Sequence, residues 1–310
     1  MGYVFALSAA LLFGLNGSVS KVIIESGITA IQLTQFRVVG AALISAVLIL
    51  FWQRESLTLK RSKWPIVLLL GVVGVGFLQA TYAYAIELLP VGVALLLEYL
   101  AVPLVALVAF FVLREQVHFR LWLAVGCIII GLAVVGEVWS STLNPIGVLW
   151  GLGAAASLAT YFLFGERELR KTSPLNLSFW TMTTASIFWA PFSGWWNLTG
   201  DALFREASLG GNLASYSMPV WVLILWNITL GSFAPFLLSL SALKRLSATA
   251  LGVVATSEII FAFIFAWLWL GEELSQFRTF GAMVVFVGIV LAQTSRNLKG
   301  VKRDRPKDKG

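Results

Sequence analysis

The chain has 310 residues, of which 59% are apolar and 12% charged, and its net charge is +7. A soluble globular protein is about 45–50% apolar and about 25% charged, so these side chains cannot cover a water-facing surface and predict an integral membrane protein. The single cysteine, Cys127, and the single histidine, His118, exclude a disulfide framework and argue against a conventional metal site, so no metal or cofactor is expected.

Ten apolar stretches follow one another along the chain, and about 20 apolar residues cross one bilayer core. Transmembrane β-strands need only about ten alternating residues, and these runs are longer and more uniformly apolar. The first stretch has no basic residue before it and predicts a permanent helix rather than a cleavable signal peptide. Connections are short except for a polar loop at 197–218. The predicted helices cover residues 3–20, 30–52, 65–86, 91–113, 120–138, 146–165, 175–195, 219–243, 248–270 and 277–294.

Basic residues in the connections predict the orientation. With the N-terminus in the cytoplasm, the inside segments carry eighteen Lys and Arg, whereas the outside segments carry only Lys21, Arg205 and Arg278. Basic loops remain in the cytoplasm, so we expect a multi-pass protein of the cell (inner or plasma) membrane with both termini cytoplasmic. Most of the net charge lies in the tail, 295–310, which we expect to meet anionic lipid headgroups rather than nucleic acid.

A shift of 157 positions aligns part of the first half with the second. It pairs Gly74 with Gly231, and Glu115 with Glu272, and both glutamates end a long apolar run. Because five spans per half is an odd number, the second copy would be inverted in the membrane, as in many secondary transporters. The prediction is an all-α membrane protein of ten transmembrane helices in two inverted five-helix repeats, 1–138 and 146–294. The alternative is a duplication that merely makes a stable bundle.

Three charged side chains fall inside the predicted spans: Arg37, Glu98 and Glu258. Each costs about 2.5–3.5 kcal/mol at the bilayer centre, so each should face a partner or a cavity. Arg37 and Glu98 lie at the same depth, about 10 Å from the outer surface at about 1.5 Å per residue. They form either a structural ion pair or a substrate or proton site with Arg37 as counter-ion. Glu258 either exchanges protons or stays protonated and bonded to Ser257 or Thr256.

Prolines within the spans free backbone carbonyls that could line a cavity. Pro103 cannot donate to the carbonyl of Tyr99, so a bend is expected that exposes this carbonyl, the phenol and the neighbouring Glu98 together. Pro235 frees the carbonyl of Gly231 in the same way. Neutral polar residues at comparable depth are candidate cavity walls, although each alone is more typical of hydrogen bonding between helices. They are Asn16, Gln79, Tyr82, Tyr161 and Ser239.

Several segments resemble the drug/metabolite transporter superfamily, specifically its EamA-type members with ten helices. They are LLFGLNGSVSK, QFRVVGAAL and LLEYLAVPLVALVAFFVLREQV in the first half, and SATALGVVATSEIIFAFIFAWLWLGEEL and GAMVVFVGIVLA in the second. The resemblance covers residues 2–294 and implies transport of small metabolites, often export of amino acids, driven by or exchanged with protons. LEYLAVP is similar to exporters of the threonine/homoserine type. The second half has no twin of Arg37, so a symmetric charged site is not expected.

Together these features predict an exporter of small metabolites that works by alternating access. We expect Glu98 and Glu258 to bind substrate or protons. The expected partners are a small molecule, membrane lipids and, if transport is coupled, a proton, with a monomer or homodimer as the assembly. A passive channel and a lipid-handling scaffold are the alternatives. An intramembrane enzyme would need a nucleophile and base or several metal ligands, and the few His, Asp and Cys residues argue against one.

Overall fold

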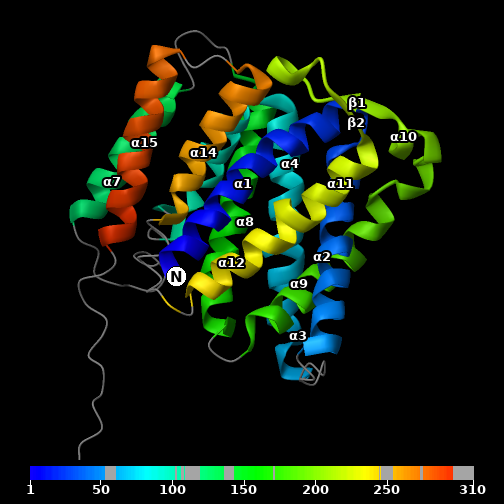
Figure 1. Cartoon of the computed structure of the whole chain (residues 1–310). Coiled ribbons are helices and arrows are strands. Elements are labelled where there is room, and N and C mark those ends of the chain that lie inside the picture. The colour runs from blue at the N-terminus through cyan, green and yellow to red at the C-terminus, as the bar shows by residue number, and fades with distance from the viewer. Residues whose placement is uncertain are drawn as a thin grey trace, which may run out of the picture.

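The structure is a computed structural model that describes residues 1–52, 61–101, 103–105, 108, 119–135, 143–169, 172–243, 245, 254–272 and 275–295. Within these residues the fold is a bundle of apolar helices with one short hairpin at its upper right in Figure 1. Several expectations lie outside the described residues. They concern the end of the fourth span, the start of the ninth, Glu115, His118 and residues 296–310 of the tail.

The first half begins with two long helices, α1 (Gly2–Glu25) and α2 (Ala30–Trp52), joined by a turn at Gly27. A third apolar run is helical from Trp64 to Leu88, through α3 (Trp64–Leu68), the π-helical η2 (Leu69–Phe77) and α4 (Leu78–Leu88). Then come α5 (Val91–Glu98) and α7 (Phe119–Val135). The π-helical segment in the third run was not predicted, because apolarity alone does not distinguish α- from π-helical hydrogen bonding.

The second half follows the same kind of order. It begins with α8 (Pro145–Leu169) and α9 (Pro174–Trp189). A continuous run follows, made of α11 (Val220–Ile228), the π-helical η6 (Thr229–Phe233) and α12 (Ala234–Leu243). The last helices are α14 (Ser257–Phe265), which η7 (Ala266–Leu270) continues, and α15 (Gln276–Ser295). The expectation that the seventh span reaches residue 195 is wrong. α9 ends at Trp189 and gives way to the 3₁₀ turn η3 (Ala190–Phe192), because Pro191 cannot continue the α-helical hydrogen bonds.

The loop between α9 and α11 is structured. It holds η4 (Trp195–Asn197), α10 (Gly200–Phe204), the antiparallel strands β1 (Glu206–Ser208) and β2 (Ser217–Pro219), and η5 (Gly211–Leu213) between the strands. We call residues 193–219 the hairpin segment. The end of the bundle that this segment covers is called the hairpin end (top right in Figure 1). Ala207 and Leu209 pack there with Val19 and Ile23 of α1, so the segment is anchored by apolar burial.

Five helical runs in the described residues are long and apolar enough to cross a membrane by length and composition, and four shorter runs are also apolar. The five are Gly2–Glu25, Ala30–Phe51, Trp64–Leu88, Pro145–Gly165 and Val220–Ser239. Large apolar side chains face outward along them; for example, Leu43 and Leu50 of α2 are 62% and 64% exposed. Such a surface is stable in lipid and not in water, which makes the chain a multi-pass membrane protein.

Glycines set how closely the helices pack. A Cβ added at Gly71 of η2 would lie 2.7 Å from the carbonyl oxygen of Thr181 in α9. α7 and α15 form a pair at one side of the bundle (Figure 1), where a Cβ at Gly131 would lie 2.8 Å from the carbonyl oxygen of Gly281. Small residues allow this close backbone approach, which favours van der Waals packing between helices in lipid.

Candidate functional site

Two helical runs are interrupted inside the bundle, at positions that the 157-residue shift relates. After α5 the chain turns at Tyr99 and Leu100, and the helix resumes at Ala101. Before α14 the helical residues 254–255 are followed by a turn at Thr256. Tyr99 and Thr256 correspond under the shift of 157. Pro103 accounts for the first break, because its ring nitrogen cannot donate to the Tyr99 carbonyl.

The two breaks contact each other through Tyr99. Its hydroxyl oxygen lies 2.8 Å from Oε2 of Glu258 and 3.0 Å from the carbonyl oxygen of Ala255. Ala255 is the last helical residue before this turn, and the N–H of Ile259 donates to the Thr256 carbonyl, so the Ala255 carbonyl needs a partner from elsewhere. The carboxyl of Glu258 thus meets Tyr99, whereas the sequence offered Ser257 or Thr256 as partners of a protonated Glu258. Ser257 instead donates to the carbonyl of Val254, three residues before it, and Glu258 faces α5.

Arg37 is buried in α2, and its Nε donates to Oγ of Ser232 at 2.8 Å. Ser232 lies in η6, so this bond joins the first half of the chain to the second. The structural ion pair with Glu98, one of the two alternatives from the sequence, is not formed. Among the described residues, ion pairs join Lys21 to Glu272 and Lys63 to Glu168. Glu98 still interacts electrostatically with Arg37 and with Glu258 at longer range.

Tyr82 completes this group. It is buried in α4 near Arg37, Glu98 and Glu258. Gly17 of α1 makes room for it, because a Cβ there would lie 2.8 Å from the Tyr82 hydroxyl. We call Arg37, Tyr82, Glu98, Tyr99 and Glu258 the charged cluster. Its members come from α2, α4, α5, the turn after α5, and α14.

The remaining candidates lie apart from the charged cluster or make other contacts. Nε2 of Gln79 is 3.9 Å from Sδ of Met182, and its Oε1 is buried with no hydrogen-bond partner in the described part of the chain. Tyr161 of α8 meets the ring of Phe236 edge-on, with ring centroids 5.6 Å apart. Ser239 of α12 is half-buried. These three contribute polar atoms to the interior from α4, α8 and α12.

Asn16 has a structural partner that sequence reasoning missed. Its Oδ1 accepts a hydrogen bond from Nδ2 of Asn227 at 2.8 Å, and the same Nδ2 is 2.8 Å from Oγ of Ser20. Asn227 is fully buried in α11. The signal was present as a lone amide within the apolar run VWVLILWNITL. This triad joins α1 to α11 in the way expected of polar residues between membrane helices.

The described residues contain no group of three or more His, Cys, Asp or Glu side chains that could hold a metal ion. The charged cluster offers two kinds of chemistry. Its guanidinium and carboxyl groups can bind complementary charges, and the Tyr99–Glu258 contact can hold or release a proton. Both require that water reach the cluster. Apolar helices around an internal cluster of charges are typical of membrane transport proteins.

The profile of the EamA-like transporter family matches residues 1–136 and again residues 145–294. The chain therefore belongs to the EamA-like transporter family and is a membrane transporter of the drug/metabolite transporter superfamily.

Individual relatives are also transporters. The uncharacterized transporter YwfM of Bacillus subtilis is 24% identical over 292 residues, which cover 93% of this chain and 92% of the relative. The threonine/homoserine exporter RhtA of Salmonella typhimurium is 26% identical over 286 residues, 90% of this chain and 83% of the relative. A crystal structure 17% identical in sequence covers 95% of this chain and 98% of its own, with a TM-score of 0.62, which supports the fold.

Proposed function

We propose that the protein exports small polar metabolites such as amino acids, that it works by alternating access, and that Glu98 and Glu258 couple transport to protons. The observation that carries this proposal is the contact of two interrupted helices through Tyr99 and Glu258 in the interior. Interrupted membrane helices place backbone groups and charges at a substrate site in many secondary transporters. The exporters of threonine and homoserine among the relatives favour an amino acid as substrate.

The proposal includes an inverted repeat, 1–138 and 146–294, followed by the tail. Three observations support duplication. The family profile matches twice, the π-helical segments η2 and η6 overlap under the shift of 157, and so do the breaks at Tyr99 and Thr256. A carrier built this way exposes its site to each side in turn by exchanging the shapes of its two halves.

Proton coupling is proposed from the hydrogen bonds of Tyr99. The hydroxyl carries one proton but lies within bonding distance of two acceptors, the Ala255 carbonyl and the Glu258 carboxyl. When Glu258 is protonated, it can donate to Tyr99 while Tyr99 donates to Ala255, and every group is satisfied. When Glu258 is ionised, Tyr99 donates to one acceptor and leaves the other unpaired. The protonation of Glu258 therefore changes the contact between α5 and α14.

The test is uptake by the purified protein in liposomes, with and without a pH gradient, over amino acids, nucleosides and cationic drugs. We expect saturable counterflow for at least one class and gradient-driven uptake for the same compound. Glu98→Gln and Glu258→Gln should each keep counterflow but reduce gradient-driven uptake by about tenfold or more, because an amide cannot carry the proton. Glu87→Gln, on an exposed position of α4, is the matched control and should resemble the parent protein.

Two results would count against this function. Full gradient-driven uptake in both Glu98→Gln and Glu258→Gln would refute the coupling. Flux that does not saturate and shows no counterflow for any class would favour a passive channel over a carrier.

A further inference from the structure

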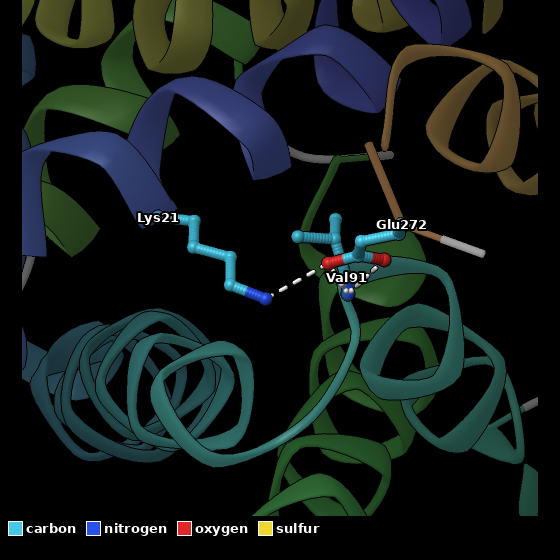
Figure 2. A network of polar contacts seen from close by, with 3 residues as sticks. All are labelled: Lys21, Val91 and Glu272. Carbon is cyan, nitrogen blue, oxygen red and sulfur yellow. Dashed lines mark hydrogen bonds and ion pairs between the residues drawn. The ribbon is translucent and has the colours of Figure 1, made fainter. Parts of the chain in front are cut away.

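Glu272 joins three separate segments at the hairpin end (Figure 2). Its Oε1 lies 2.8 Å from Nζ of Lys21 in α1, and both carboxylate oxygens lie 3.2 Å from the backbone nitrogen of Val91, which donates to them. Val91 is the first residue of α5, and Glu272 follows η7. One side chain thus connects the end of α1, the start of α5 and the end of the α14–η7 run.

The carboxylate acts as the missing cap of α5. The first N–H groups of a helix have no partner within the helix, and the residue before α5 is Pro90, which provides no side-chain cap. A carboxylate at this position also interacts favourably with the positive end of the helix dipole. Because the cap comes from a distant part of the chain, it restrains α5 relative to α14 as well as satisfying the backbone.

The backbone around Glu272 is shaped to hold it there. Gly271 adopts a left-handed conformation, with φ of 68°, which ends the helical run directly after η7. The N–H of Glu272 then donates to the carbonyl of Ala266 at 3.1 Å. The side chains of Lys21 and Glu272 remain 19% and 17% exposed. Water therefore reaches this ion pair, and ion pairs in contact with water are weak enough to break and re-form.

The hairpin segment makes hydrogen bonds to two of the same elements. Nδ2 of Asn212 donates to the carbonyls of Trp267 and Leu268, and Nε1 of Trp269 donates to the carbonyl of Leu209 at 2.7 Å. These bonds attach the segment to η7. On its other side the guanidinium of Arg205 donates to the carbonyl of Ser26, at the end of α1. The hairpin segment thus bridges two of the three elements that Glu272 also connects.

The three connected elements are also those around the proposed transport site. α5 carries Glu98 at its last residue, about 10 Å along the helix from Val91 at about 1.5 Å per residue. The α14–η7 run carries Glu258, and α1 packs against α14. Separation of α1, α5 and α14 at the hairpin end would open a path along these helices to Glu98 and Glu258.

We propose that Lys21, Glu272 and the N-terminus of α5 form a latch that holds the hairpin end closed, and that this latch opens when the transport site turns to that side. Glu272 is a positioning residue in this proposal, since it acts on the site through α5. The inference rests on the proposed alternating access and names the residues that keep one end of the protein closed. Nothing in the latch requires a particular substrate, so it can be tested without one.

The experiment measures from which side the centre of the protein can be labelled. Ser232→Cys is introduced into a Cys127→Ser background, so that a membrane-impermeant methanethiosulfonate reagent reports access to the position next to Arg37. Intact cells and inverted vesicles present the two faces separately. Glu272→Ala should increase labelling from the hairpin end by about tenfold, the change expected from losing a charge-assisted hydrogen bond, and should reduce labelling from the opposite end.

Further variants separate the latch from general destabilisation. Lys21→Met removes only the ion pair and keeps the cap on Val91, so it should show a smaller increase and serves as the test if Glu272→Ala does not fold. Lys21→Arg should behave like the parent. Lys63→Met is the matched control, because it breaks the other partly exposed ion pair, with Glu168 at 2.5 Å, and should leave labelling from the hairpin end unchanged.

Unchanged labelling in folded Glu272→Ala or Lys21→Met would overturn the latch, as would an equal increase in Lys63→Met. The outcome is independent of the transport assay. If the labelling shifts but Glu98→Gln and Glu258→Gln transport normally, the latch stands and only proton coupling is lost. If those variants lose coupling but the labelling does not shift, the proposed function stands and the latch is wrong.

Discussion

At the scale of single residues, Tyr99 is the side chain that relates the two halves most directly. Its hydroxyl bridges the turn after α5 to the turn before α14, and its ring is buried. The sequence predicted Tyr99 as a cavity residue beside Glu98, because Pro103 frees its carbonyl. It did not indicate that the hydroxyl would reach Glu258, since that contact depends on how α5 and α14 are rotated toward each other.

Replacing Tyr99 by phenylalanine tests this bridge. Tyr99→Phe leaves the Ala255 carbonyl and the Glu258 carboxyl without the hydroxyl, and an unpaired buried group costs about 1–3 kcal/mol. We expect a lower unfolding temperature and weaker dependence of transport on the pH gradient. Thermal unfolding in detergent and gradient-driven uptake in liposomes measure these effects. Tyr84→Phe is the control, because Tyr84 is half-buried and its ring stacks on Trp150 with centroids 4.8 Å apart. Equal effects of the two substitutions would contradict the assigned role.

At the scale of elements, helix pairing depends on small residues at particular positions. α7 and α15 approach closely at Gly131, Gly281 and Gly288, where added Cβ atoms would meet backbone atoms at 2.7–2.9 Å. Gly126, on the same helix α7, has no atom within 4 Å of an added Cβ among the described residues. Gly126 and Gly131 of α7 therefore have different roles, although both lie in similar apolar sequence.

Alanine substitutions should separate these roles. Gly131→Ala places its methyl group against backbone that cannot move cheaply, so we expect a loss of about 1–3 kcal/mol. Gly126→Ala meets open space and favours the helix by reducing the freedom of the unfolded chain, so a gain of about 0.4–1 kcal/mol is expected. Unfolding temperatures of the two variants in one detergent measure the difference. If both substitutions destabilise the protein to the same degree, the close approach at Gly131 is not what stabilises the contact between α7 and α15.

At the scale of the whole molecule, the membrane orientation remains a prediction from charge. The eighteen basic residues on one side against three on the other predict cytoplasmic termini. The hairpin segment would then lie outside. In the structure α1 begins at the end opposite the hairpin segment (Figure 1), so the N-terminus and this segment lie at different ends of the bundle.

Topology reporters test this orientation. A reporter that is active only outside the cytoplasm should be inactive when fused after Gly310 and active when inserted after Ala214, within the hairpin segment. Activity is read in intact cells, with protein amount as the control for expression. An active reporter at Gly310 together with an inactive reporter at Ala214 would show the reverse insertion and would place the latch on the cytoplasmic side.

The sequence by itself determined the class of protein and the positions of most helices, and it singled out Arg37, Glu98 and Glu258 as charges within apolar runs. These follow from one-dimensional quantities, namely how long an apolar run is and where charges interrupt it. Only the tertiary structure decided which charges meet. Arg37 bonds to Ser232 instead of pairing with Glu98, Glu258 meets Tyr99, and Glu272 meets Lys21 and Val91. In water an amphipathic pattern indicates which face of a helix is buried, but in lipid both the buried and the exposed faces are apolar. Helix rotation is then set by close packing at positions such as Gly71 and Gly131, and the partners of the buried charges follow from that rotation.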